Sequence, residues 1–369
     1  MKTLLEIISY GFLSLLLTIS FIPFIRKVAI SVNLVDKPNY RKVHLDTVPL
    51  IGGIAIALVV FMVIFISGFR NVFIKEYFSV FAGAITLLIV GIIDDKNDIS
   101  AKYKLAIQLI LALIIALSGT RLTSLYGLFG IYEISTWIQY LLTILIITGV
   151  VNAFNLMDGV DGLMGGLSLI GFSIFLISAI YFKDYFLVFL SAVFMGAIVG
   201  FLKFNLGKKK IFIGDSGSLF IGFIMITLAI KFLQKNMLPH DTTPDLVLLI
   251  LLVFFSIPVF DSLRVYMGRM KNGKSPFKAD KSHLHHLLLS IGLTHKKVDI
   301  VISAICMLML ILIVSLKSFL TMTLIIMLLI LSFSIIIRLL LMINKLYQWT
   351  TRIKVMECSV NKKESNLDY

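Results

Sequence analysis

The sequence predicts an all-α polytopic membrane protein with about eleven transmembrane helices. Of its 369 residues, 59% are hydrophobic and only 15% are charged, whereas soluble domains are nearer half apolar and a quarter charged. The apolar residues gather in separate runs of roughly 20, the length that an α-helix needs to cross a bilayer. The alternating pattern of membrane β-strands is absent.

Eleven apolar runs define the predicted spans. The first is too long for a signal peptide, lacks a small-residue cleavage site and is followed by Arg26 and Lys27, so we expect it to be retained. The predicted spans are residues 4–25, 50–69, 77–93, 104–118, 136–153, 163–182, 185–203, 217–233, 245–263, 298–316 and 319–341.

The segments between the spans contain no soluble domain and no internal repeat. We therefore expect one membrane domain, residues 1–343, and a charged, frayed cytoplasmic tail, residues 344–369. Residues 119–135 suit a small hairpin, and the loop 264–297 is long enough for a short amphipathic helix. The two cysteines imply no disulfide framework, because one lies in an apolar run and the other in the tail.

The basic residues predict the orientation. Of 34 lysines and arginines, 26 lie in the loops 26–49, 94–104, 154–162, 203–216 and 264–297 and in the tail from Arg338. The positive-inside rule then puts the N-terminus outside and the C-terminus in the cytoplasm. The net charge of +14 follows this pattern, so we expect a lipid bilayer and no nucleic acid as its partner.

Four polar clusters lie where a predicted span meets one of these inward loops. They are Asp94 with Asp95, residues 152–162, residues 214–218 and residues 280–286. Carboxylates left in hydrocarbon are costly, so their repetition at span ends needs a reason. All four clusters fall on the predicted cytoplasmic side, although basic residues alone assigned that side. We therefore expect one polar site at that membrane face.

Asp94 and Asp95 end the third predicted span. Adjacent carboxylates point in different directions at a helix end, so one can face a metal ion or a phosphate while the other orients a lysine. A solvated helix end is the alternative, and it is disfavoured because a helix C-terminus already carries negative partial charge.

The segment 152–162 breaks the fifth predicted span. Its two Asp-Gly steps also suit a plain turn. Unlike the other inward loops, however, its stretch 154–162 has no lysine or arginine. Asn155, Asp158 and Asp161 therefore lack counter-ions in this segment, which favours a bound cation or another polar ligand.

Residues 214–218 open the eighth predicted span. Their glycines allow close approach, and exposed amides at a helix N-terminus attract phosphate. An ordinary N-cap at Asp215 is the alternative. The preceding lysines, residues 208–210, mainly follow the positive-inside pattern and also suit the steering of an anionic substrate.

The loop 264–297 carries many basic residues and three close histidines, His283, His285 and His286. Two of them lie one helical turn apart, which suits zinc, but no cysteine or second histidine cluster completes a zinc site. Basic side chains with imidazoles suit a diphosphate or a sugar better.

Together the clusters predict a phosphate-handling site. Separated carboxylates hold a hard cation such as Mg²⁺, which keeps waters that substrate phosphates replace. Lysines, arginines and glycine-rich amides neutralise a transferring phosphoryl group. At the inner membrane face, such a site can join a water-soluble nucleotide to a lipid phosphate.

Six ordered motifs resemble the polyprenyl-phosphate N-acetylhexosamine-1-phosphate transferases, a glycosyltransferase 4 type family, over nearly the whole chain. The resemblance implies transfer of N-acetylglucosamine-1-phosphate, or a related N-acetylhexosamine-1-phosphate, from a UDP-sugar to undecaprenyl phosphate. His-Leu-His-His at 283–286 is similar to the N-acetylglucosamine branch rather than the branch with three consecutive histidines. The motifs are residues 36–53, 94–95, 152–162, 214–219, 258–264 and 275–286.

The resemblance also implies residue roles. Asp215 matches the metal-ligand aspartate, and Asp94 and Asp95 match paired acids near the lipid phosphate, with Asp94 the better candidate to accept its proton or position it. Further matches are catalytic or metal-adjacent (Asp158, Asp161), phosphate-contacting (Lys42, Lys104), nucleotide-binding (Asn155, Asn205), sugar-recognising (His283, His285, His286) or otherwise substrate-binding (His44, Arg264).

The same resemblance implies release of UMP, a need for Mg²⁺ with Mn²⁺ as the alternative, and a homodimer. It places the protein in the plasma (inner) membrane at the first membrane step of cell-surface polysaccharide, O-antigen or teichoic acid synthesis. A single displacement is expected, and a two-step route through a phospho-aspartate stays open. A transporter is the rival class, but transporters carry ionisable groups near the bilayer midplane in repeated halves.

Overall fold

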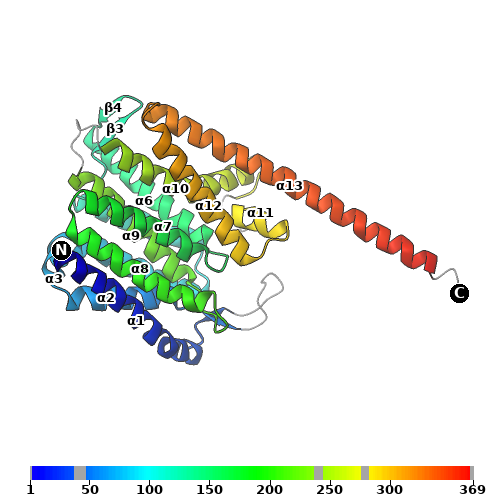
Figure 1. Ribbon diagram of the computed structural model, residues 1–369, viewed down its shortest axis with the longest axis horizontal. Helices are drawn as coiled ribbons and strands as arrows, with labels where there is room; N and C mark the ends of the chain where they lie inside the picture. The colour runs from blue at the N-terminus through cyan, green and yellow to red at the C-terminus, as the bar shows by residue number, and fades with distance from the viewer. Residues whose placement is uncertain (1, 37–46, 237–243, 276–281, 366–369) are drawn as a thin grey trace.

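The computed structural model describes residues 2–36, 47–236, 244–275 and 282–365, which form a bundle of long helices (Figure 1). One π-helical turn, Phe73–Tyr77, and two antiparallel strand pairs join them: β1 (Val35–Asp36) with β2 (Val48–Pro49), and β3 (Ser124–Leu128) with β4 (Ile131–Glu133). The helices are α1 (Lys2–Ser31), α2 (Gly52–Ile66), α3 (Arg70–Val72), α4 (Phe78–Asn97), α5 (Ala101–Leu117), α6 (Thr136–Met157), α7 (Leu163–Tyr181), α8 (Tyr185–Asn205), α9 (Gly214–Asn236), α10 (Pro244–Lys271), α11 (Leu284–Ser290), α12 (His295–Leu316) and α13 (Met322–Ser365).

Each predicted span falls on one of these helices, in order. In the part of the chain that the structure describes, nine helical segments are long and apolar enough to cross a membrane. The two remaining predicted spans correspond to shorter helices, α2 with 15 residues and α5 with 17. An all-α, multi-pass membrane protein is therefore confirmed, whereas the count of eleven and the orientation of the termini stay predictions.

Several helices continue past the apolar spans, so the predicted loops are shorter than expected. Asp94 and Asp95 lie inside the last turns of α4, and Arg264 lies on α10 rather than in a loop. The backbone hydrogen bonds of a helix do not stop where hydrocarbon meets water. α4 ends only where Asp98 adopts a left-handed backbone (φ 52°), the conformation common at helix C-termini.

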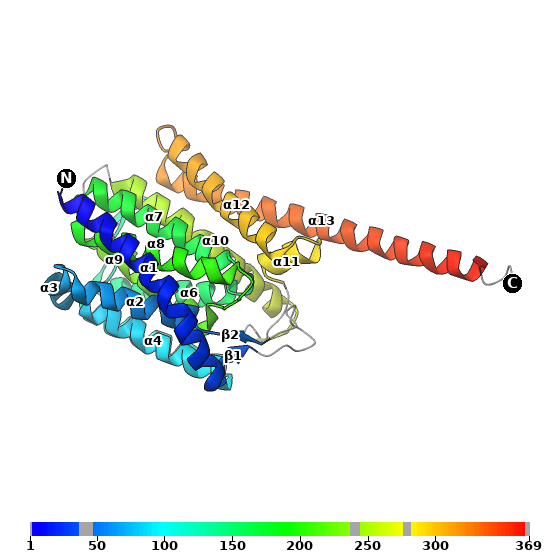
Figure 2. The same cartoon turned by 60° about the horizontal axis from the view of Figure 1, so that its bottom comes forward.

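The prediction that the tail from residue 344 is frayed is wrong. α13 continues as one helix of 44 residues and projects well beyond the body of the bundle (Figures 1 and 2). No glycine or proline interrupts residues 322–365, so nothing in this stretch breaks a helix. At the base of the projection, Ser290 of α11 donates a hydrogen bond to Asn344 (3.1 Å).

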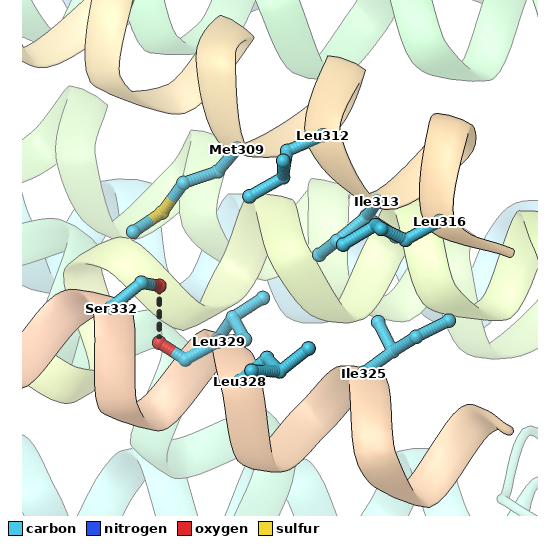
Figure 3. Close-up of a pocket in the computed structure, with 8 residues that line it drawn as sticks. All are labelled: Met309, Leu312, Ile313, Leu316, Ile325, Leu328, Leu329 and Ser332. Atoms are coloured by element: carbon cyan, nitrogen blue, oxygen red, sulfur yellow. Dashed lines mark hydrogen bonds between the residues drawn. The ribbon is translucent and has the colours of Figure 1, made fainter. Parts of the chain in front are cut away.

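Two smaller predictions are confirmed. The hairpin expected in residues 119–135 is the β3–β4 pair, and the short helix expected in the loop 264–297 is α11. A small apolar pocket also opens between α12 and α13 (Figure 3), lined by leucine, isoleucine and methionine side chains and by Ser332. It contains no ionisable side chain, so it is not the predicted polar site.

Helix α9 lies at the centre of the bundle, and 94% of its most apolar 18-residue window is buried. Its first turn meets α2 and α4 backbone to backbone. A Cβ added to Gly53 would lie 2.2 Å from Cα of Gly217, and one added to Gly91 would lie 2.3 Å from Cα of Ser216. Small residues permit such close helix packing in membranes. These contacts bring the C-terminal end of α4 against the N-terminus of α9.

Candidate active site

Two of the predicted acids meet at one lysine. Nζ of Lys104, on α5, lies 2.5 Å from Oδ2 of Asp94 on α4 and 3.1 Å from Oδ2 of Asp215 on α9. We call these three residues the acid–lysine cluster. Asp94 is nearly enclosed, with 4% of its side chain exposed, whereas 32% of the Asp215 side chain is exposed. When both carboxylates are ionised, two negative charges face one ammonium, and the cluster then favours a further cation.

Asp95 points elsewhere and caps α9. Its carboxylate oxygens accept hydrogen bonds from the backbone N–H groups of Asp215 (2.8 Å) and Ser216 (3.2 Å), two donors that an α-helix leaves unpaired at its start. Gly214 allows this approach, because it has a positive φ of 73° and a Cβ there would lie 2.5 Å from Asp95 Oδ2. The two adjacent acids thus hold different partners, and the catalytic role of Asp95 stays a prediction.

The end of α6 joins the same region. Asn155 was expected in a loop, but α6 continues through it, and its side-chain amide donates to Oγ of Ser218 (3.0 Å). Ser218 in turn donates to the backbone carbonyl of Asp215 (3.3 Å). These bonds fasten α6 to the first turn of α9. An amide from a fourth helix, α6, thus lies beside the acid–lysine cluster.

Asp158 follows α6 directly, in the segment that has no basic residue. Burial raises the pKa of Asp158 well above its usual range, and the negative charges of Asp215, Asp95 and Asp161 raise it further. A carboxyl surrounded by other carboxylates favours its ionised form only when a cation arrives. The surroundings of Asp158 therefore agree with the expectation that the segment 154–162 binds a cation.

Asp161 is different, because a lysine and a histidine face it. Lys210 Nζ lies 2.6 Å and His295 Nδ1 lies 3.5 Å from its Oδ2. Burial alone would raise the pKa of Asp161, but the hydrogen bonds with His295 and Lys210 outweigh it and lower that pKa. Lys210 comes from the lysine run that the sequence assigned mainly to membrane orientation. Part of that run thus pairs with a candidate site residue.

Asn205 is buried and uses its side chain to join two loops. Its Oδ1 accepts from the backbone N–H of Gly162 (2.7 Å), and its amide donates to the carbonyl of Ile211 (2.9 Å). The side-chain oxygen and nitrogen of Asn205 are therefore both hydrogen-bonded to backbone groups. Asn205 thus stabilises the loops beside the site, and its contact with the nucleotide stays a prediction.

A second cluster forms between α10 and α11. The Asp261 carboxylate is fully enclosed and accepts from Nη2 of Arg264 (2.7 Å) and from the backbone N–H of Leu284 (3.0 Å), and it contacts Nδ1 of His283 at 2.9 Å. Arg264 also donates to the carbonyl of Ser282 (2.5 Å). We call Asp261, Arg264, His283 and His285 the histidine cluster.

His285 and His286 lie beside His283. The ring centroids of His283 and His285 lie 6.0 Å apart with nearly parallel planes, and those of His285 and His286 lie 4.3 Å apart. Burial, with the neighbouring histidines, lowers the pKa of His285 to about 3, so its imidazole is neutral at pH 7. A Cβ added to Gly159 would lie 2.9 Å from Nε2 of His285. The histidine cluster thus touches the loop that carries Asp158.

Two predicted residues, Lys42 and His44, lie outside the described residues. Sequence reasoning gave no role to Asp261, although it lies in the motif 258–264, or to His295. An aspartate inside an apolar run was a signal for Asp261, because such a charge in a span is costly and usually functional. His295, beside two lysines at the start of α12, carries no comparable signal.

The donor atoms of the acid–lysine region suit a magnesium ion. Within residues 2–36, 47–236, 244–275 and 282–365, no three His, Cys, Asp or Glu side chains gather closely enough to hold a metal alone. Zinc needs three or four such ligands, whereas Mg²⁺ takes one or two carboxylates and completes its shell with water and substrate phosphates. The partly exposed carboxylate of Asp215, beside Asn155, therefore fits Mg²⁺ or Mn²⁺.

Known proteins resemble this chain over most of its length. Residues 77–233 match the family model described as glycosyl transferase family 4. The chain is 34% identical over 319 residues to a probable undecaprenyl-phosphate N-acetylglucosaminyl 1-phosphate transferase of Bacillus subtilis (strain 168), covering 86% of this chain and 87% of that protein. It is 32% and 31% identical over 294 residues to the undecaprenyl-phosphate alpha-N-acetylglucosaminyl 1-phosphate transferases of Yersinia pestis and Escherichia coli (strain K12), covering 78% of each chain.

The matched segment runs from the start of α4 to the end of α9 and so contains the whole acid–lysine cluster. The histidine cluster follows it, within the longer region aligned with the Bacillus protein, which spans most of both chains. Both clusters therefore lie in the region that this chain shares with its relatives. This chain belongs to glycosyl transferase family 4.

Proposed function

We propose that this protein transfers N-acetylglucosamine-1-phosphate, or a related N-acetylhexosamine-1-phosphate, from a UDP-sugar to undecaprenyl phosphate and releases UMP. The observation that carries the proposal is the acid–lysine cluster, in which Asp94, Lys104 and Asp215 converge from three helices beside the glycine-rich start of α9. Carboxylates for a divalent cation and an ammonium for phosphate are what phosphoryl transfer needs. The names of the relatives supply the two substrates.

The proposed reaction is one in-line displacement. An oxygen of the lipid phosphate attacks the β-phosphorus of the UDP-sugar, a new P–O bond forms, and the bond from that phosphorus to the bridging oxygen breaks, so that UMP leaves. Asp94 positions the lipid phosphate and takes its proton when it arrives protonated. Lys104 neutralises phosphate charge and holds the reacting group in place.

The engagement of Asp94 favours this single step over a phospho-aspartate route. Its Oδ1 accepts from the backbone N–H of Ile99 (2.6 Å), and its Oδ2 holds Lys104. A carboxylate with both oxygens occupied is a poor nucleophile, whereas it orients a lysine well. A burst of UMP in the absence of undecaprenyl phosphate would instead favour the two-step route.

Asp215 is the residue that would hold Mg²⁺ or Mn²⁺, with Asn155 and Asp158 at its side. Once bound, the cation neutralises the diphosphate and the leaving UMP. Asp158 then gains the counter-charge that the segment 158–162 lacks. The nearby start of α9 offers its remaining backbone amides to a phosphate.

The distribution of basic residues supports a cytoplasmic active site in the plasma membrane. The acid–lysine cluster lies next to the loops that are predicted to face inward. A UDP-sugar and a lipid phosphate can meet there, and the lipid-linked product suits the first membrane step of surface polysaccharide or teichoic acid synthesis.

A reconstituted assay tests this function. Purified protein is incubated with undecaprenyl phosphate, Mg²⁺ and a panel of UDP-sugars, and both UMP release and the lipid product are followed. We expect turnover with UDP-N-acetylglucosamine or a related UDP-N-acetylhexosamine that stops on addition of EDTA. Absence of lipid-linked product with every UDP-sugar, or turnover that chelation leaves unchanged, would contradict the proposal.

A further inference from the structure

Asp261 is the acid of the histidine cluster, and the proposed function gives it no role. None of its surface is exposed. It lies within α10, one turn before Arg264 and 22 residues before His283. Burying an isolated carboxylate is costly, so its surroundings must compensate for it.

Three groups compensate for the charge of Asp261, and they come from both sides of the α10–α11 junction. Arg264 supplies a guanidinium at 2.7 Å, and the backbone N–H of Leu284 donates to both carboxylate oxygens at 3.0 and 3.1 Å. The third group is Nδ1 of His283, at 2.9 Å. One carboxylate therefore fixes the start of α11 and the ring of its first histidine together.

These contacts determine which nitrogen of His283 carries the proton. An ionised carboxylate only accepts hydrogen bonds, so Nδ1 of His283 is the donor. The guanidinium of Arg264 also faces the Asp261 carboxylate and balances its charge. The proton on Nδ1 leaves Nε2 of a neutral ring as an acceptor.

Nε2 of His283 has no hydrogen-bond partner among the described residues, although only 5% of the side chain is exposed. Nδ1 of His285, at 2% exposure, is also unpartnered within the same part of the chain. Buried polar atoms normally have partners. Two such nitrogens in one cluster, which approaches the loop of Asp158 through His285, indicate that a polar ligand completes it.

We propose that Asp261 is a positioning residue, which holds His283 so that Nε2 accepts a hydrogen bond from a hydroxyl or acetamido N–H group of the donor sugar. The proposal rests on the proposed function, since it assumes a UDP-sugar as donor. A neutral acceptor nitrogen suits a sugar and repels a phosphate oxygen, so the histidine cluster binds the sugar end while the acid–lysine cluster binds the phosphates.

Asp261→Asn tests the role of the carboxylate. The amide N–H₂ of asparagine donates towards Nδ1 and moves the ring proton to Nε2, where it no longer accepts. We expect kcat/KM for the UDP-sugar to fall roughly 10- to 100-fold, as is common when the partner of a functional histidine is changed. KM for undecaprenyl phosphate and inhibition by UDP, which lacks the transferred N-acetylhexosamine, should stay within about twofold.

The matched control is Asp184→Asn. Asp184 is also a buried carboxylate, 3.1 Å from Lys235, and its Oδ1 caps the start of α8, a role that asparagine fills equally well. We expect wild-type kinetics from it. Equal losses for UDP and UDP-sugar in Asp261→Asn would mean general damage to the fold and would overturn the proposal.

Two variants of His283 keep the test decisive even if Asp261→Asn does not fold. His283→Asn carries its amide nitrogen near the position of Nδ1 and loses Nε2, so it should keep its Tm and lose affinity for the UDP-sugar. His283→Gln reaches towards the position of Nε2 and should keep more of that affinity. If the asparagine variant binds UDP-sugar as tightly as the wild type, the proposal is wrong.

The double variant Asp261→Asn with His283→Asn separates positioning from an independent contribution. Because Asp261 acts through His283, the double variant should lose no more than about threefold beyond the worse single variant. Losses that multiply would overturn the proposal. An inactive wild type would contradict the proposed function instead, so the two failures are distinguishable.

Discussion

The acid–lysine cluster and the histidine cluster both contain a buried carboxylate, but the two are compensated differently. Asp94 shares one lysine with Asp215, so two acids face one ammonium and one of the acids is partly exposed. Asp261 is balanced by Arg264 and is fully enclosed. The first cluster therefore favours an incoming cation, and the second presents neutral nitrogen atoms. A charged diphosphate and an uncharged sugar need these two different surroundings.

The two clusters are also held by different means. The acid–lysine cluster sits where backbones touch, because Gly91 packs against Ser216 and Gly53 against Gly217. In the histidine cluster, one side chain, Asp261, bridges α10 and α11. Added bulk should therefore damage the first cluster, whereas a change in hydrogen-bonding chemistry should damage the second.

The largest effect is expected from Asp215→Asn. Loss of this carboxylate removes the proposed metal ligand and one of the two acids at Lys104. We expect kcat to fall by about 10²–10³-fold or more, with Tm close to that of the wild type because Asp215 is partly exposed. UMP release at several Mg²⁺ concentrations is the measurement, with Asp184→Asn as the control. Wild-type rates in this variant would show that Asp215 is not the metal ligand.

Gly91→Ala should come next. The new methyl group would meet the backbone of Ser216 at 2.3 Å, so α4 must move away from α9 and disturb the cap made by Asp95. Overpacking of this kind costs about 1–3 kcal/mol of stability, and a shift of about 1 Å at the site costs about 100-fold in rate. Thermal unfolding and UMP release are measured together.

The control for the glycine prediction is Gly149→Ala on α6, where nothing lies within 4 Å of the added Cβ. It should keep wild-type activity and be no less stable, since alanine is the better helix former. If both alanine variants behave alike, backbone contact does not hold the acid–lysine cluster.

A smaller effect concerns acid stability of the histidine cluster. The folded state lowers the pKa of His285 from 6.5 to about 3, so in this range the unfolded chain binds a proton that the folded chain does not. Stability is therefore complete above pH 6.5 and falls as the pH drops towards 3, by up to about 1.4 kcal/mol per unit. In His285→Gln this contribution to the pH dependence of stability should vanish, and Tm measured between pH 7 and 4 checks it. An unchanged dependence of Tm on pH would show that His285 does not cause the loss of stability.

The smallest effect is expected from Lys210→Gln. Its partner Asp161 is largely buried, but 44% of the lysine side chain is exposed, and such pairs contribute about 0–1 kcal/mol. We expect a modest loss of stability and less than about tenfold in kcat/KM. The control is Lys209→Gln, an exposed neighbour, which should change neither stability nor kcat/KM. Equal effects from both lysines would indicate electrostatic steering of the substrate rather than the Lys210–Asp161 ion pair.

Local patterns predicted much of this protein. The apolar runs predicted the order of the long helices, and the segment 119–135 forms the expected hairpin. The polar clusters at the span ends predicted one site, and Asp94, Lys104 and Asp215 lie together there. These features depend on residues close in sequence or on motifs with known spacing. The length of α13 was missed because charge was taken as a sign of fraying, although no helix breaker interrupts it.

The sequence by itself determined that the chain crosses a membrane and which acids lie at the ends of its spans. Only the tertiary structure decided what each side chain holds: Asp95 caps α9, Asn205 joins two loops, and Asp261 grips His283 across the α10–α11 junction. The physical reason is that helix formation is encoded locally by hydrophobicity and helix propensity. Hydrogen-bond partners, in contrast, depend on which helix ends meet. Contacts between residues far apart in the sequence, such as Gly91 against α9, determine which ends do so.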